Sequence, residues 1–439
     1  VTIESGGEVE VVGNNQINDD TDVTVNSSGT FTLNGEETIS VLDNSGTVTV
    51  NENLTATDIT GAGTGSIAIA NTKTLTAIND NASTYSGTMS GAGSLTKEGT
   101  NTLTLAGSSA NTYTGATTVS DGTLALNKSA GTDALGDGTG DVTIESGAEV
   151  EILANNQINN NTNIVLDGGT LTLGNDVSEG GTTDNTSGIN KLQLNANSDL
   201  AFATDDTKPS IINIADLDTG TSNLRVLNWD GDTGGIGSGD RFLLDDDSLT
   251  NVSRSDIEFS GFGVTGKIVD SGIANVKELV PDIDEFVWEG DTAGSKDLWG
   301  EGDNWDGGVS PSNKGETAVF DDTGNSQLTV NIPGSTTGTT TTISRIEIKD
   351  NDYTIQNDNT MQDNTIQLEP EVSGVFTAVD VSGSNVTAEI ASNLIIADSS
   401  EFDVNNINSK LTVSGDISES GGPFGITKKG TGTLELSGT

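Results

Sequence analysis

The chain has 439 residues, of which 32% are hydrophobic and 4% aromatic, and its net charge is −49, from 66 acidic and 17 basic residues. This charge disfavours nucleic acid and anionic membrane surfaces as partners, because phosphate recognition needs a basic patch. Cysteine and histidine are absent, which excludes disulfides, thiolate metal sites, cysteine nucleophiles and histidine-dependent triads. No run of about 18 apolar residues is present, so we expect no membrane insertion by a helix.

The chain repeats itself nearly word for word from its first residue. The phrase VTIESGGEVEVVGNNQIN starts at Val1 and returns as VTIESGAEVEILANNQIN at Val142. A second phrase, SLTKEGTNTLTLAGS, starts at Ser94 and returns as GITKKGTGTLELSGT at Gly425. Such self-similarity predicts a repeat architecture. Because no signal-peptide pattern precedes the first phrase, we expect a processed chain or the ordered part of a longer one.

The apolar residues alternate with polar ones, which is the pattern of half-buried strands. In residues 142–152, valine and isoleucine alternate with threonine and glutamate around a Ser146-Gly147 turn, and residues 163–174 repeat the form around Gly168-Gly169. The interior positions predicted by this alternation include Val142, Ile144, Leu171, Leu173, Leu103 and Leu105.

The strand spacing also suits a sandwich or a barrel, but recurring phrases such as GTLTL at 169–173 favour stacked coils. We therefore predict an all-β β-solenoid built from degenerate repeats, with a thin aliphatic core. In register, its side chains would form aliphatic, asparagine and threonine ladders along the stack. Helical patterning is nearly absent.

Two breaks in the strand pattern divide the chain. The first covers residues 222–247 and the second residues 287–322, after a linker near Pro281. We predict a β-solenoid over 1–281, a Trp-rich spacer or cap over 282–322, and a continuing β-solenoid over 323–439.

Acidic residues gather in the first break. Asp230, Asp232, Asp245, Asp246 and Asp247 are candidate calcium ligands, because calcium takes several carboxylate and carbonyl oxygens. The alternative is a set of solvated acidic turns, which the charge of −49 favours. Neither an EF-hand loop nor a glycine-rich calcium repeat occurs, and we expect no other cofactor.

Three of the four tryptophans lie in the second break, at Trp288, Trp299 and Trp305. Exposed, they would form a platform for stacking against sugar rings. Buried, they would form a small core that caps the solenoid, which is the interpretation we favour.

One phrase carries a family resemblance. Residues 91–126 read Gly-x-Gly-x-Leu-x-Lys-x-Gly, then Thr-Leu-Thr-Leu, Asn-Thr-Tyr-Thr-Gly and Gly-Thr-Leu. This phrase resembles the autotransporter-associated β-strand repeat of bacterial autotransporter passengers, and the Trp-rich stretch is similar to a spacer of such proteins. The resemblance implies a right-handed parallel β-helix and an extracellular or bacterial cell-surface location. It implies no single activity, because such passengers differ widely.

Three functions follow as hypotheses. The first is a structural protein forming a rigid surface rod, a matrix fibre of a biofilm, or a filament. The second is an adhesin passenger that binds glycans or surfaces through the tryptophans. The third is a polysaccharide-acting enzyme, which the scarcity of basic residues and the lack of histidine disfavour, so we expect no catalytic residues.

The chain begins inside one repeated phrase and ends inside another, and neither end reads as a polar cap. Uncapped solenoid edges carry unpaired backbone groups. We therefore expect the chain to bind itself head to tail, as an open homopolymer. The alternative is a longer chain, whose flanking repeats would supply the same contacts.

Overall fold

The computed structural model describes most of the chain as β-strands and turns. The described residues are 1–180, 188–204, 208–231, 239–245, 256–260, 264–273, 275–282, 284–288, 298–300, 304–305, 310–321, 329–332, 340–349, 352–357, 364–370 and 373–438. They contain no α-helix, so the all-β prediction is confirmed for them. Accordingly, the described part of the chain holds no helix long and apolar enough to span a bilayer. The chain forms two compact units, residues 1–257 with 267–280 and residues 258–266 with 281–439.

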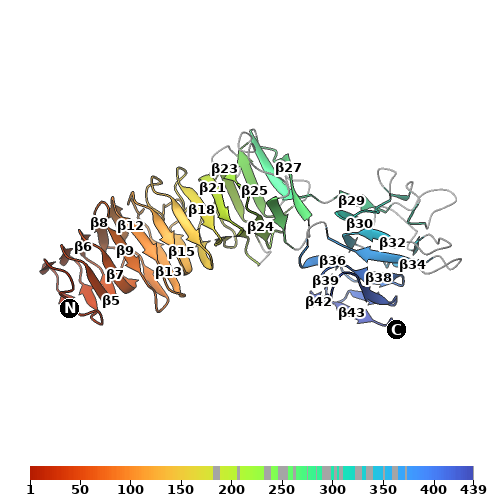
Figure 1. Cartoon of the computed structure of the whole chain (residues 1–439), viewed down its shortest axis with the longest axis horizontal. Helices are drawn as coiled ribbons and strands as arrows, with labels where there is room; N and C mark the ends of the chain where they lie inside the picture. The colour runs from red at the N-terminus through yellow and green to blue at the C-terminus, as the bar shows by residue number, and fades with distance from the viewer. Residues whose placement is uncertain are drawn as a thin grey trace. The chain divides into compact units, whose positions relative to one another are not determined.

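The first unit is a stack of parallel strands in three series (Figure 1). The first series runs β1 (Thr2–Ile3), β3 (Val23–Val25), β5 (Glu37–Asn44), β7 (Leu54–Thr60), β9 (Thr74–Ala77), β12 (Ser94–Lys97), β14 (Thr117–Val119), β16 (Val142–Glu145), β18 (Asn163–Asp167), β21 (Ile189–Ala196), β23 (Ile211–Asp218) and β25 (Arg241–Asp245). The short β20 (Ser178–Glu179) also pairs with β23.

The other two series of the first unit succeed one another along the chain, because the third begins at Ser83, close to where the second ends at Gly91. The second series runs β2 (Glu8–Val11), β4 (Thr30–Leu33), β6 (Thr47–Val50), β8 (Ser66–Ile69) and β11 (Thr88–Gly91). The third runs β10 (Ser83–Tyr85), β13 (Thr102–Gly107), β15 (Gly122–Lys128), β17 (Ala148–Ile152), β19 (Thr170–Leu173), β22 (Ser198–Ala201) and β24 (Leu224–Leu227). Successive strands therefore alternate between series, so the chain winds in coils.

Columns of like residues run along the stack because the strands pair in register. Leu103 pairs with Leu124, Leu124 with Val150, and Val150 with Leu171, and all of these side chains are buried. On the outer face the column consists of Thr38, Thr55, Thr76, Thr96, Thr118 and Thr143. Asparagines also stack, as where Asn51 donates to Asn34. The six predicted interior residues, Val142, Ile144, Leu171, Leu173, Leu103 and Leu105, are all buried, as predicted.

The parallel order of the first unit ends at β25. Its next partner, β28 (Val276–Pro281), runs antiparallel to it, with Phe242 opposite Leu279. Two more strands, β26 (Ile257–Phe259) and β27 (Val264–Asp270), also pair antiparallel. An antiparallel partner changes the hydrogen-bonding pattern of a parallel ladder, so the parallel ladder of this series ends at β25.

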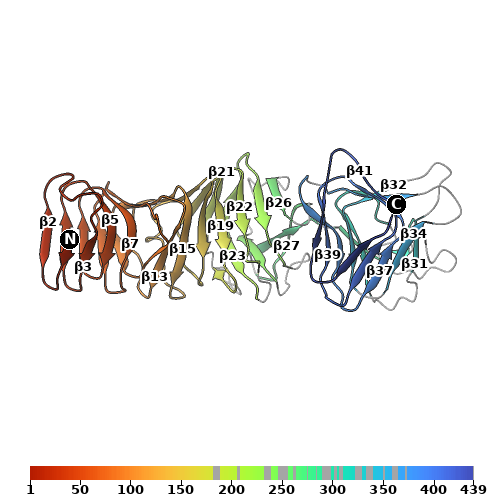
Figure 2. The same cartoon turned by 90° about the horizontal axis from the view of Figure 1, so that it is seen from below.

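The second unit also winds through three parallel series, shown together in Figure 2. One series runs β29 (Asp284–Val287), β30 (Glu316–Phe320), β33 (Arg345–Ile348), β36 (Phe376–Val381), β39 (Ser400–Val404) and β42 (Ile426–Lys429). The second runs β31 (Thr329–Ile332), β34 (Thr354–Asn357), β37 (Thr387–Ile390), β40 (Lys410–Val413) and β43 (Thr433–Leu436). The third runs β32 (Thr340–Ile343), β35 (Thr365–Leu368), β38 (Asn393–Ile396) and β41 (Ile417–Glu419). From β33 onward each consecutive strand joins the next series in turn, three strands to a coil.

Candidate functional site: buried polar contacts between coils

The structure describes two of the five predicted calcium ligands, Asp230 and Asp245. Asp232, Asp246 and Asp247 lie outside the described residues. The carboxylate of Asp230 accepts a hydrogen bond from the backbone N–H of Asp240 at 3.0 Å, and Asp245 ends β25. Within the described ranges, no three acidic side chains come together as metal ligands would. Calcium binding therefore stays a prediction.

The structure brings Asp230 together with Asp240, a residue that no sequence pattern singled out. Asp240 is 5% exposed, and its carboxylate accepts the backbone N–H of Ser210 at 2.7 Å. Burial, reinforced by the negative charge of Asp230, raises the pKa of Asp240 to about 7, although the Ser210 N–H opposes the shift. Asp240 therefore changes its protonation state near neutral pH in the folded chain.

Replacing Asp240 with asparagine is expected to remove a pH dependence of stability. The pKa of Asp240 is about 7 in the folded chain, above the ordinary value of 3.8 that it regains on unfolding, so its stabilising contribution is complete below pH 3.8 and is lost as the pH rises through 7. Wild type should therefore weaken relative to Asp240→Asn between pH 5 and pH 8, by about 1.4 kcal/mol for each pH unit between pH 5 and the folded pKa of about 7. Urea unfolding at both pH values measures this, with the exposed-turn variant Asp19→Asn as control. Parallel pH profiles for wild type and Asp240→Asn would contradict it.

Buried lysines link neighbouring coils. Lys97 follows the inward alternation of β12 and is 0% exposed. Its Nζ donates to three backbone carbonyls, of Glu98 at 2.8 Å, Gly99 at 2.7 Å and Asp121 at 3.0 Å. The Asp121 carbonyl belongs to the following coil. Burial lowers the pKa of Lys97 to about 8, while the charges of Asp121 and Glu98 oppose the shift.

A second buried lysine joins three coils in the same way. Lys128, at the end of β15, is 2% exposed, and its Nζ donates to the carbonyls of Gly87 at 3.0 Å and Ala106 at 2.9 Å. Burial lowers its pKa to about 8. Each ammonium thus supplies hydrogen-bond donors to carbonyls of its own or neighbouring coils, as buried polar groups require.

The Asn-Thr-Tyr-Thr-Gly phrase at 111–115 also contributes to the interior. The Asn111 side chain accepts the N–H of Met89 at 2.8 Å and donates to the carbonyl of Ala134 at 2.7 Å, so it connects the coils before and after its own. The Tyr113 ring is 1% exposed, and its hydroxyl lies 2.6 Å from the Thr117 hydroxyl. These contacts give the phrase a role in fixing the register between coils.

The repeated Asn-Asn-Gln-Ile-Asn phrase is held by a glutamate one coil later. Glu37 accepts the consecutive N–H groups of Gln16 and Ile17 at 2.5 and 3.0 Å. In the second copy, Glu179 accepts those of Gln157 and Ile158 at 2.8 and 3.1 Å. Glu37 is 3% and Glu179 0% exposed. The two copies therefore share one device, a carboxylate that binds two loop amides.

The three tryptophans form a core in the second unit. Trp288, Trp299 and Trp305 are at most 1% exposed, and the Trp305 ring lies 5.1 Å from Trp288 and 5.0 Å from Trp299. The Trp299 indole N–H donates to Pro311 O at 3.0 Å, and that of Trp305 to Trp299 O at 2.7 Å. Buried rings present no face to a sugar, so the glycan-stacking interpretation has no support from their position.

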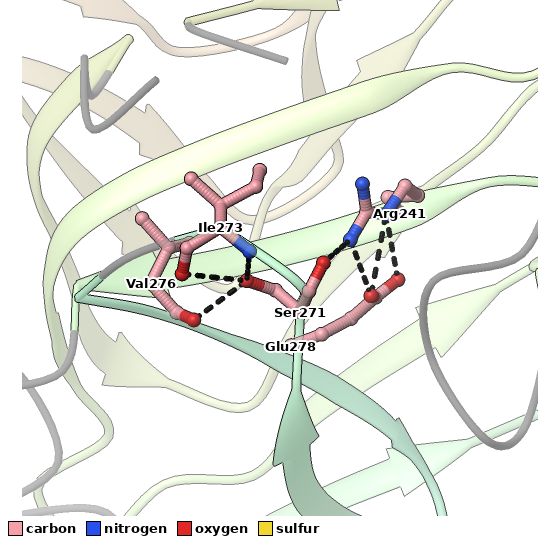
Figure 3. A network of polar contacts seen from close by, with 5 residues as sticks. All are labelled: Arg241, Ser271, Ile273, Val276 and Glu278. Carbon is pink, nitrogen blue, oxygen red and sulfur yellow. Dashed lines mark hydrogen bonds and ion pairs between the residues drawn. The ribbon is translucent and has the colours of Figure 1, made fainter. Parts of the chain in front are cut away.

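A buried ion pair joins the antiparallel strands β25 and β28 of the first unit (Figure 3). The Arg241 guanidinium donates to both carboxylate oxygens of Glu278, the closest at 2.8 Å, and to the carbonyl of Ser271 at 2.7 Å. The Glu278 side chain is 1% exposed and that of Arg241 13%. The Ser271 hydroxyl in turn donates to Val276 O at 2.6 Å. This network fixes β28 against β25.

One comparison with known proteins found a match, to a segment of the first unit. Residues 95–126 match the passenger-associated transport repeat family, which confirms the resemblance to autotransporter passengers for that stretch. The match starts in β12 and ends in β15, and it includes Lys97, Asn111 and Tyr113. No curated protein and no solved structure matches the chain.

Proposed function

We propose that this chain is a structural passenger on the bacterial exterior, whose parallel series of strands close into a right-handed β-helix that forms a stiff surface rod. The supporting observation is the in-register parallel stack of the first unit, in which residues 95–126 match a passenger repeat. Right-handed connection is the strong preference of parallel strands in one sheet. A passenger repeat is expected on secreted or surface proteins, which is the basis for the proposed location.

The proposal assigns no catalytic function and no obligatory cofactor. The chain has no histidine and no cysteine. With 17 basic residues against 66 acidic ones, few lysine and arginine side chains remain to form a subsite that binds an acidic polysaccharide. Adhesion to glycans through the tryptophans loses its basis, because those rings are buried. A surface rod needs only a stable backbone ladder and a soluble acidic coat.

Head-to-tail assembly is part of the proposal. In the second copy of the repeated phrase, the preceding coil covers Gln157, which is 0% exposed and accepts the N–H of Lys128 at 2.7 Å. In the first copy, Gln16 is exposed. A preceding coil of the same kind would cover Gln16 as the internal coil covers Gln157. We propose a second copy of this chain as the source of that coil; preceding repeats of a longer chain are the alternative source.

Two measurements test these proposals separately. Antibody labelling of intact cells of the native organism should detect the chain outside; labelling only after lysis would overturn the surface role. Light scattering and electron micrographs of the natively purified protein should show rods that lengthen with concentration. Rods of one fixed length and a monomer mass at every concentration would overturn the head-to-tail assembly and leave the surface role standing.

A further inference from the structure

A small cavity lies inside the first unit, beside the tyrosine of the passenger repeat. Its volume is about 10 Å³. Its lining comes from successive coils and includes Tyr113, Thr117, Gly136, Gly140 and Thr162. A cavity of at least about 10–15 Å³ can hold one water molecule when polar groups line it.

One lining group has no hydrogen-bond partner in the protein. The Oγ1 of Thr162 is buried without a partner, and the residue is 0% exposed. A buried hydroxyl without a hydrogen bond costs about 1–3 kcal/mol in protein mutational data, and native structures rarely leave one so. Thr162 therefore points to a ligand that donates or accepts a hydrogen bond inside the cavity.

The second polar group is the hydroxyl pair of Tyr113 and Thr117, whose oxygens lie 2.6 Å apart. One of the two hydroxyls donates to the other, so the second keeps a hydrogen that needs an acceptor. Tyr85, in the shorter echo of this phrase, shows the satisfied case. Its hydroxyl receives the amide N–H of Asn44 at 3.2 Å and donates to the carbonyl of Thr88 at 3.3 Å.

Side chains cannot fill the cavity from its glycine positions. A Cβ on Gly136 would meet the carbonyl oxygen of Tyr113, and one on Gly140 would meet that of Gly115. The backbone of the neighbouring coil thus approaches too closely for any other residue at these two sites. The space that both hydroxyl groups line is therefore left for a molecule as small as water.

We propose that this cavity binds a single structural water, which bridges Thr162 Oγ1 to the Tyr113–Thr117 hydroxyl pair. The water links the coil of the passenger repeat to the coil that contains Thr162. It gives a partner to Thr162 Oγ1, which has none in the protein, and accepts the remaining hydrogen of the hydroxyl pair, as buried waters do elsewhere. This inference concerns the first unit and stands independently of the proposed surface role.

Thr162→Val tests the proposal, because valine keeps the shape of threonine and removes the hydroxyl. A high-resolution crystal structure of the wild type should show water density at hydrogen-bond distance from Thr162 Oγ1, about 2.7 Å. The variant should lose that density and melt about 2–4 °C lower. Thr118→Val, on the outer face of β14, is the matched control and should melt like wild type.

A melting temperature of Thr162→Val that is not lower than that of wild type would overturn the proposal. If the cavity is dry, Thr162→Val removes an unpaired buried hydroxyl, and the variant should melt at the same temperature as wild type or higher. Absence of density beside Thr162 Oγ1 in the wild-type crystal would overturn it equally, whatever the melting temperature of the variant.

Discussion

Replacing Leu103 with aspartate is expected to unfold the coils around β13. Leu103 is 0% exposed and stacks between Ser83 and Leu124 in the buried column of the first unit. Truncating a buried leucine to alanine alone costs about 2–5 kcal/mol. An unpaired carboxylate in the same position adds several more, because no cation in that column can neutralise it.

Hydrogen exchange read by mass spectrometry measures this effect. Protection should be lost over β10, β13 and β15 and retained in the second unit, because coils contact only their neighbours. Thr104→Asp is the matched control, since Thr104 occupies the next position of the same strand and faces outward. Equal protection in the two variants would show that the assignment of Leu103 to the interior is wrong.

Replacing Lys97 with methionine is expected to loosen the junction between β12 and the coil that follows. Methionine fills nearly the same volume but cannot donate hydrogen bonds, so the carbonyls of Glu98, Gly99 and Asp121 lose a shared partner. An unsatisfied buried acceptor costs about 1–3 kcal/mol. Relief of the buried charge offsets part of this cost, and we expect a net loss of about 2 kcal/mol.

The chain contains its own control for Lys97. Lys428 stands at the same place in the repeated phrase, and its Nζ donates to the carbonyls of Lys429 and Gly430, the latter at 3.0 Å. Lys428 is half-buried, so water can replace its ammonium group at those carbonyls. Lys428→Met should change stability by less than about 0.5 kcal/mol in urea unfolding. Similar losses in both variants would contradict the role given to the buried carbonyls.

The strands and the core could be predicted because their signal is local. Alternation within a few residues assigns Ile144 and Leu171 to the interior, and this assignment does not depend on the sequence of the neighbouring coils. The same alternation also carried an unused signal. In SLTK, residues 94–97, Lys97 has the inward parity of Leu95, so a buried lysine could have been expected there.

The polar contacts between coils could not be predicted in this way. Whether Glu179 or Asp240 is buried depends on which loop of the preceding coil packs over it, and alternation within one strand does not contain that information. One repeated signal existed for the glutamate, since each Asn-Asn-Gln-Ile-Asn phrase is followed about one coil later by an acidic residue, Glu37 or Glu179. No such repetition marks Asp240.

The direction of strand pairing at the end of the first unit could not be predicted from the sequence either. Residues 222–247 differ in composition from their surroundings, but nothing in them distinguishes a parallel from an antiparallel neighbour. The antiparallel partner β28 lies about thirty residues beyond β25, and the contact that holds it, Arg241 with Glu278, joins residues distant in sequence. For the tryptophans, the choice between burial and exposure depended on packing against Phe320, whose ring centre lies 5.8 Å from that of Trp305.

The position of the two VTIES copies in the stack has a consequence for the gene. Their strands β1 and β16 belong to the same series and are separated by seven successive parallel pairings. Recombination between the two near-identical segments would therefore delete or duplicate seven whole coils and leave the phase of every remaining strand unchanged. Since each coil contacts only its neighbours, the new junction would reuse contacts that already exist. Variation in length among alleles should thus come in whole coils.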